Sequence, residues 1–116
     1  MSIIEAINQV DAQIHNTCTE AEKRGWLSTL DGLVQALLFG AQEAFSGYGE
    51  SDEDTQLKIP APFDEVYLYW LEGKIHYANG DFTRFNNANA MFAGAWQRYA
   101  AFVHRSGGSA AENCFY

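Results

Sequence analysis

The fold is decided by residues 60–105, which read PAPFDEVYLYWLEGKIHYANGDFTRFNNANAMFAGAWQRYAAFVHR. Pro60 and Pro62 stop any helix that precedes them, and a new helix is expected to begin around Pro62 or Phe63. Asp64 and Glu65 then fall in its first turn, where acidic side chains favour the positive end of the helix dipole. Little of this helix is polar as far as Tyr77, so we expect it to be covered on more than one side.

The end of this helix and the start of the next are also marked. Asn79-Gly80 supplies a left-handed stop, and Asp81 supplies the cap of a helix that runs from Phe82 to about His104. So short a connection makes the two helices antiparallel neighbours. We therefore predict a long antiparallel hairpin, whose second helix buries one stripe: Phe85, Ala88, Phe92, Trp96, Tyr99 and Val103.

The first half of the chain has helical periodicity as well. Ser2 with Glu5 three places on forms a capping box for a first helix that ends near Asn16. Thr19 with Glu22 repeats the arrangement for a second helix. The predicted buried stripe of the second helix is Trp26, Leu27, Leu30, Val34, Leu37, Leu38 and Ala41.

Two details of the second helix and the segment after it complete the pattern. Asp31-Gly32 interrupts the second helix, and we interpret the glycine as permitting close approach of a neighbouring backbone. Residues 46–61 are rich in glycine and acidic side chains without helical period, so an exposed loop is expected. Leu57 and Ile59 are predicted to fasten its far end to the core.

The predicted fold is therefore all-α, with four principal helices and a long acidic loop between the second and the third. A chain of 116 residues with 47% hydrophobic content is long enough for one core. We expect a single helical domain over residues 1–105 and a flexible C-terminal tail over residues 106–116.

The charge of the chain bears on its partners. Fifteen acidic residues against seven Lys and Arg give a formal net charge of -8. Because binding to a phosphate backbone relies on clustered cations, sequence-specific binding to nucleic acid is not expected. Only Cys18 and Cys114 are present, without a secretory signal or a long apolar run, so we expect free thiols in a reducing compartment and no membrane segment.

The hairpin holds the residues that favour a protein interface. Asparagine is a mediocre helix former, so three asparagines within five helical positions indicate that packing or a partner sets this stretch. Aromatic side chains commonly anchor interfaces, although ordinary core packing accounts for most of those in this chain. The candidate interface residues are Tyr67, Tyr69, Trp70, Asn86, Asn87 and Asn89.

No reaction is indicated by the sequence. His15 and Cys18 have the gap of a zinc half-site, but His104 and Cys114 complete no standard spacing, so no metal site is predicted. Glu72 and His76 are four apart, whereas di-iron bundles repeat Glu-x-x-His. No nucleophile or phosphate loop is marked by its context. We expect neither an enzyme nor a cofactor.

Three segments, taken in order, resemble a known family. They are KRGWLSTLDG at residues 23–32, IPAPFDEVY at 59–67 and NGDFTRFNN at 79–87. Their order and spacing are similar to those of small head-tail connector or neck proteins of tailed phages and prophages of Gram-positive bacteria, over about residues 4–105. The chain departs from that pattern at His15-Asn16, Phe92-Ala93 and His104-Arg105.

The resemblance implies a non-enzymatic structural protein that forms a ring or a lower homo-oligomer at the portal vertex and contacts portal or neck proteins. It also implies a place in the bacterial cytoplasm during assembly, and in the virion if the prophage is functional. The alternative is a small helical adaptor of a bacterium that presents the asparagine and aromatic face to one other protein.

Overall fold

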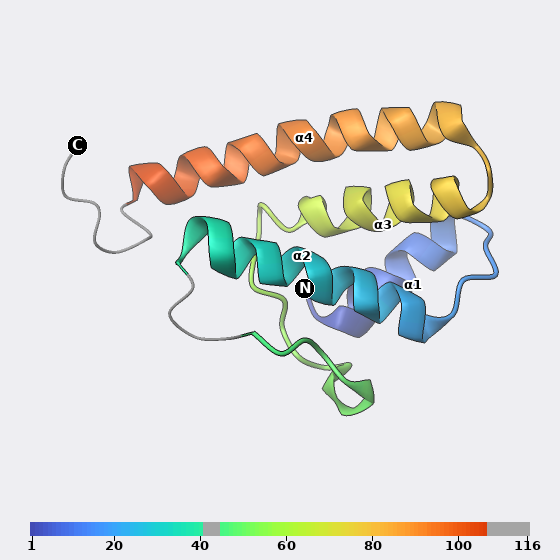
Figure 1. Cartoon of the computed structure of the whole chain (residues 1–116), viewed down its shortest axis with the longest axis horizontal. Helices are drawn as coiled ribbons and strands as arrows, with labels where there is room; N and C mark the ends of the chain where they lie inside the picture. The colour runs from blue at the N-terminus through green and yellow to red at the C-terminus, as the bar shows by residue number, and fades with distance from the viewer. Residues whose placement is uncertain (41–44, 107–116) are drawn as a thin grey trace.

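The fold is all-α, as predicted. The computed structural model describes residues 1–40 and 45–106. Its elements in chain order are α1 (Ile3–Gln13), α2 (Glu20–Leu38), the short 3-10 helix η1 (Glu50–Asp52), α3 (Glu65–Ala78) and α4 (Phe82–Arg105). Figure 1 shows α4 lying along α3, with α1 and α2 on the other side of α3. The predicted tail and Ala41 lie largely or wholly outside the described residues.

Both predicted capping boxes are present. The Ser2 hydroxyl accepts from the Glu5 backbone N–H, and the Glu5 carboxylate accepts from the Ser2 N–H at 2.8 Å. Thr19 and Glu22 exchange the same pair of bonds at the start of α2. These contacts satisfy backbone donors that a helix start leaves free, which is why the sequence alone located both helix starts.

The turn between α3 and α4 was also predicted correctly. Gly80 has a φ of +77°, a conformation that residues with a Cβ rarely adopt. Asp81 caps α4 by accepting from the Arg84 N–H at 3.2 Å. The 24 residues of α4 span about 36 Å, so the hairpin is the longest feature of the molecule.

The start of α3 differs slightly from the prediction. The helix begins at Glu65 rather than at Pro62 or Phe63, and the Asp64 side chain makes no capping bond. Just before the helix the chain turns through backbone hydrogen bonds between residues three positions apart, such as the one that Phe63 N–H donates to the Pro60 carbonyl. The Ala61-Pro62 peptide in this turn is cis. Asp64 instead lies 3.7 Å from the N-terminal ammonium group.

The loop before α3 is anchored to the start of α1. Leu57 donates its backbone N–H to the carbonyl of Met1, and Ser2 forms an isolated antiparallel bridge with Gln56. Leu57 and Ile59 are buried, which confirms that they fasten the far end of the loop. η1 gives the acidic stretch a helical turn that the sequence pattern did not predict.

The core forms around α3 and takes residues from all four α-helices. Its largest fully buried side chains include Ile3, Leu27, Leu30, Tyr67, Leu71 and Ile75. One part of the predicted α2 stripe is wrong: Leu37 is 64% exposed. Leu37 lies on the side of α2 that faces α4 across a groove, and no described residue closes over it.

Candidate protein-binding surface

The binding surface depends on how α2 is held against α3, and a buried carboxylate does this. Asp31 in the middle of α2 is fully buried. Its carboxylate accepts from the hydroxyls of Tyr48 at 2.5 Å and Tyr67 at 2.6 Å, and from the backbone N–H of Lys58 at 3.1 Å. A buried carboxylate needs such donors because desolvation would otherwise disfavour its charge. Asp31 thus joins α2, the loop and α3.

Tyr67 serves this internal junction, although the sequence nominated it as a candidate interface residue. Its hydroxyl donates to Asp31 and also accepts from the Ile59 N–H at 2.7 Å, and its side chain is fully buried. The residue therefore contributes nothing to the surface of this chain. The sequence signal that could have found the junction is the charged Asp31 inside an otherwise apolar helix face.

The two tyrosines have perturbed acidity. Burial raises the pKa of the Tyr67 hydroxyl well above its ordinary range, and the neighbouring Asp31 charge adds to the increase. Burial and the bond to Asp31 raise the pKa of Tyr48 in the same direction. Both phenols are therefore held in the protonated form, in which they can donate to the carboxylate.

Gly32 lies beside this junction. A Cβ added there would meet the Phe45 ring at 3.6 Å, which is an ordinary contact. The neighbour is thus a side chain and not the close backbone that the sequence suggested. Phe45 packs edge-on against Tyr48, so the loop covers one side of α2.

The other side of α2 borders an apolar groove of about 130 Å³. α2 forms one wall, Trp70 of α3 contributes to the floor, and α4 forms the second wall. The lining residues are Leu30, Leu33, Leu37, Trp70, Phe92 and Trp96. Leu33 is 41% exposed, so large apolar side chains at the rim face solvent. Of these residues the sequence singled out only Trp70 as a candidate for an interface.

Trp70 keeps the groove in shape. Its indole N–H donates to the Trp26 carbonyl at 2.8 Å, which ties α3 to α2. Its ring packs at a tilt of 45° against Phe92 with centroids 5.1 Å apart, and the Lys74 ammonium lies 4.6 Å from its centroid. A cation over an indole ring is attracted by the ring's quadrupole. The groove thus has rigid aromatic walls and one cation near its edge.

The remaining candidate interface residues lie along the hairpin. Tyr69 is half-buried, whereas Asn86, Asn87 and Asn89 are exposed on α4. Asn89 also lies close to Gly73 of α3, since a Cβ built on that glycine would come within 3.3 Å of its side-chain oxygen. The structure therefore brings Trp70 into the groove and leaves the asparagines on the hairpin surface.

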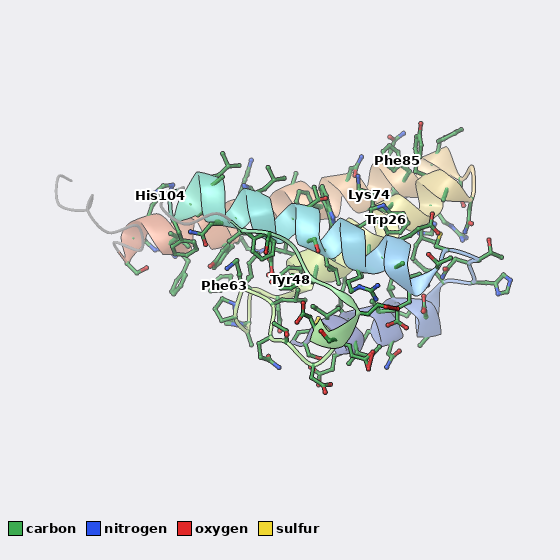
Figure 2. All side chains as sticks on the ribbon, turned by 60° about the horizontal axis from the view of Figure 1, so that its bottom comes forward. Trp26, Tyr48, Phe63, Lys74, Phe85 and His104 are labelled. Carbon is green, nitrogen blue, oxygen red and sulfur yellow. The ribbon has the colours of Figure 1, made fainter. Side chains whose placement is uncertain are left out.

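A second set of aromatic side chains gathers at the α3–α4 turn. Tyr77 packs against Phe82 and Phe85, with ring centroids 5.6 and 5.2 Å away. Tyr77 is 61% exposed and Phe82 is 57% exposed. Figure 2 shows Phe85 near this end of the hairpin, with Phe63 and His104 toward the other end.

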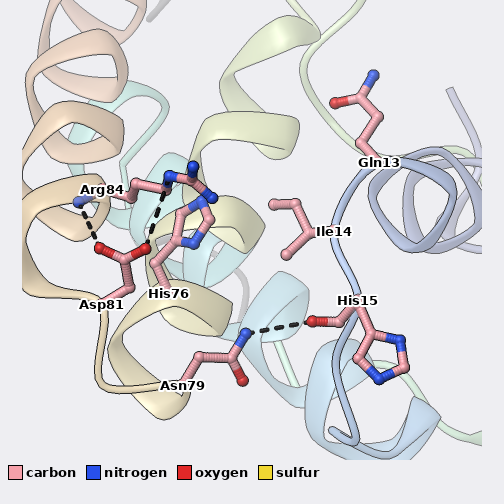
Figure 3. A pocket seen from close by; sticks show the side chains of 7 residues that line it. All are labelled: Gln13, Ile14, His15, His76, Asn79, Asp81 and Arg84. Carbon is pink, nitrogen blue, oxygen red and sulfur yellow. Dashed lines mark hydrogen bonds and ion pairs between the residues drawn. The ribbon is translucent and has the colours of Figure 1, made fainter.

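A polar pocket of about 320 Å³ lies where the end of α1 meets the hairpin turn. Figure 3 shows its lining: Gln13, Ile14, His15, His76, Asn79, Asp81 and Arg84. Asn79 donates to the His15 carbonyl at 3.2 Å, and Arg84 Nε lies 3.6 Å from the Asp81 carboxylate. The Asn79 bond ties the segment after α1 to the hairpin turn, and within the hairpin the Asp81 charge offsets that of Arg84.

Among the described residues there is no group of three or more His, Cys, Asp or Glu side chains placed to hold a metal ion. Cys18 is a free thiol, and Cys114 of the considered zinc arrangement lies outside the described range. Within residues 1–40 and 45–106, no helix has the length and apolar character needed to cross a membrane.

The groove between α2, α3 and α4 is therefore the strongest candidate for a functional surface, because it is apolar, open and held in shape by bonds to the core. Comparison with protein-family models, with curated proteins and with solved structures found no match to this chain.

Proposed function

We propose that this chain is a non-enzymatic structural subunit that acts by binding other protein subunits, in the manner of the phage head-tail connector proteins its sequence resembles. The partners are further copies of the chain and the portal or neck proteins of the same particle. The proposal includes no reaction, cofactor or nucleic-acid specificity.

The open apolar groove carries the proposal. Leu33 and Leu37 stand 41% and 64% exposed beside the rings of Trp70, Phe92 and Trp96. Fully burying one leucine side chain contributes about 1.5–3 kcal/mol, so this surface gains free energy when another protein covers it. Exposed apolar patches flanked by polar surface commonly mark protein interfaces.

The charge of the chain supports the same function. A net charge of -8 opposes retention of a polyanion, which suits a protein placed beside a DNA channel. The negative side chains Glu50, Asp52, Glu53 and Asp54 gather in and beside η1. This part of the proposal predicts no tight, salt-sensitive affinity for DNA.

The groove also fits the alternative of a small helical adaptor. Grooves lined by apolar side chains from two or three helices accept a single amphipathic helix of a partner protein. The two functions differ in stoichiometry, because a connector subunit joins a ring or a portal, whereas an adaptor binds one helix as a monomer or dimer.

Native mass spectrometry tests the proposal, with the chain alone and mixed with the portal protein encoded nearest to it. A homo-oligomer or a portal complex is expected. A Leu37→Glu variant should form less of either complex, while its circular dichroism spectrum stays helical. A matched Met91→Glu variant, at an exposed α4 position outside the groove, should behave as the parent. A monomer indifferent to portal at high concentration would contradict the connector function.

A further inference from the structure

The exposed face of α2 has no charge over most of its length. Residues 25–40 contain one charged residue, Asp31, and that residue is fully buried. The chain has 22 charged residues in total, so the other 21 fall outside this stretch. The exposed positions within the helix are Gly25, Thr29, Leu33, Ala36 and Leu37, and Phe39 and Gly40 just beyond its end are exposed as well. Depletion of charge is a property of interface cores.

A glycine on this face has no neighbour among the described residues that requires the absence of a side chain. Gly25 lies inside α2, is exposed, and would meet nothing within 4 Å if it carried a Cβ. A glycine inside a helix costs about 1 kcal/mol relative to alanine. Neither a positive φ nor packing against the described residues accounts for this glycine, and its missing side chain leaves room for the backbone of another molecule to approach α2 closely.

The exposed face of α2 is also complementary in shape to the same face of a second, antiparallel copy. Gly25 and Ala36 are eleven residues apart, about three turns, and so lie on the same side of α2. Small residues occupy the Gly25 end, and Leu37 projects beside Ala36 at the other end. An antiparallel second copy would set the bulky end of each helix against the small end of the other. A twofold contact requires such self-complementarity.

We propose that α2 packs against α2 of a second copy of this chain in antiparallel orientation, with Gly25 of each copy beside Ala36 of the other. This inference rests on the proposed function and names the partner of this face. Leu33 and Leu37, on the adjoining row, are then partly covered at the edge of the groove.

Electrostatics favours this contact over others between two copies. Each copy has a net charge of -8, so copies repel through most of their surface. The α2 face offers an approach without facing charges, and the Lys74 ammonium at the groove edge makes the local field less negative.

The size of the face sets the expected strength. The fourteen helical residues 25–38 span roughly 21 Å, and a helix is about 10 Å wide. Such a strip is smaller than the ~800 Å² per partner of a standard interface, so the dimer is expected to be weak and concentration-dependent. The contact closes after two copies, so a ring would need another surface as well.

Disulfide trapping tests the register directly. In a Cys18→Ser, Cys114→Ser background, Gly25→Cys and Ala36→Cys chains are mixed and oxidised. The mixture should cross-link as a 1:1 heterodimer at least tenfold faster than either variant alone. A mixture of Gly25→Cys with Ala90→Cys, at an exposed position on α4, reports random collision. Cross-linking no faster than this control, or fastest for one variant alone, would overturn the proposal.

Sedimentation of the unmodified protein over a wide concentration range separates this inference from the proposed function. We expect a monomer–dimer equilibrium. The Ala36→Glu variant should abolish it, and the Ala90→Glu variant should leave it unchanged. If the chain stays monomeric but binds portal, the inference fails and the proposed function stands. If it neither dimerises nor binds portal, both fail.

Discussion

At the scale of single residues, the bond from Tyr67 to Asp31 is expected to contribute strongly to stability. Tyr67→Phe removes the donor to the buried carboxylate and leaves the Ile59 N–H without its acceptor. Losing a hydrogen bond to a buried charged group costs about 2–3 kcal/mol. We expect the free energy of unfolding in urea to fall by that amount. Tyr69→Phe, at a half-buried neighbour, should change it by less than about 0.5 kcal/mol.

The same junction predicts a loss of stability at high pH. The Tyr67 pKa is raised in the folded state above its ordinary value of 10.0, so the folded protein retains a proton that the unfolded chain loses. The contribution of this hydroxyl to the free energy of unfolding is therefore fully present below pH 10. Above pH 10 that contribution declines by about 1.4 kcal/mol per pH unit. Urea unfolding at pH 9 and pH 11 measures the decline. Tyr67→Phe should reduce it, and an unchanged decline would remove Tyr67 as its cause.

At the scale of elements, two glycines should respond to the same substitution with opposite signs. Gly80 between α3 and α4 has a φ of +77°, so Gly80→Ala should destabilise the hairpin by about 1 kcal/mol. Gly25 is exposed inside α2 with open space beside it, so Gly25→Ala should stabilise the chain by about 0.5–1 kcal/mol. Thermal unfolding of dilute samples, where dimerisation is negligible, measures both. A loss of stability for Gly25→Ala would indicate an internal role for that glycine.

At the scale of the whole molecule, salt should strengthen self-association. Two copies with a net charge of -8 repel, whereas the α2 face has no charge to be screened. Raising the ionic strength from about 0.01 M to 1 M shortens the Debye length from about 30 Å to 3 Å. The dissociation constant from sedimentation should therefore fall as salt is added. A rise would instead indicate that ion pairs hold the copies together.

Local features of the sequence determined the helices of this protein. The capping boxes at Ser2 and Thr19, and the Asn79-Gly80-Asp81 turn, act through bonds between residues at most a few positions apart. Such bonds need no distant partner, so the sequence located the helices and the hairpin, and the two apolar side chains Leu57 and Ile59 also marked where the loop meets the core. The start of α3 was misplaced by two to three residues, because the bonds of the preceding turns override the signal of Pro62.

Tertiary structure alone decided which side chains face solvent. Tyr67 reads as an interface aromatic, yet it bonds with Asp31, 36 residues away. Leu37 reads as core, yet it lies exposed because α2 and α4 leave a groove between them. The physical reason is that periodicity identifies the apolar face of a helix, whereas burial depends on whether another element lies within contact distance of that face.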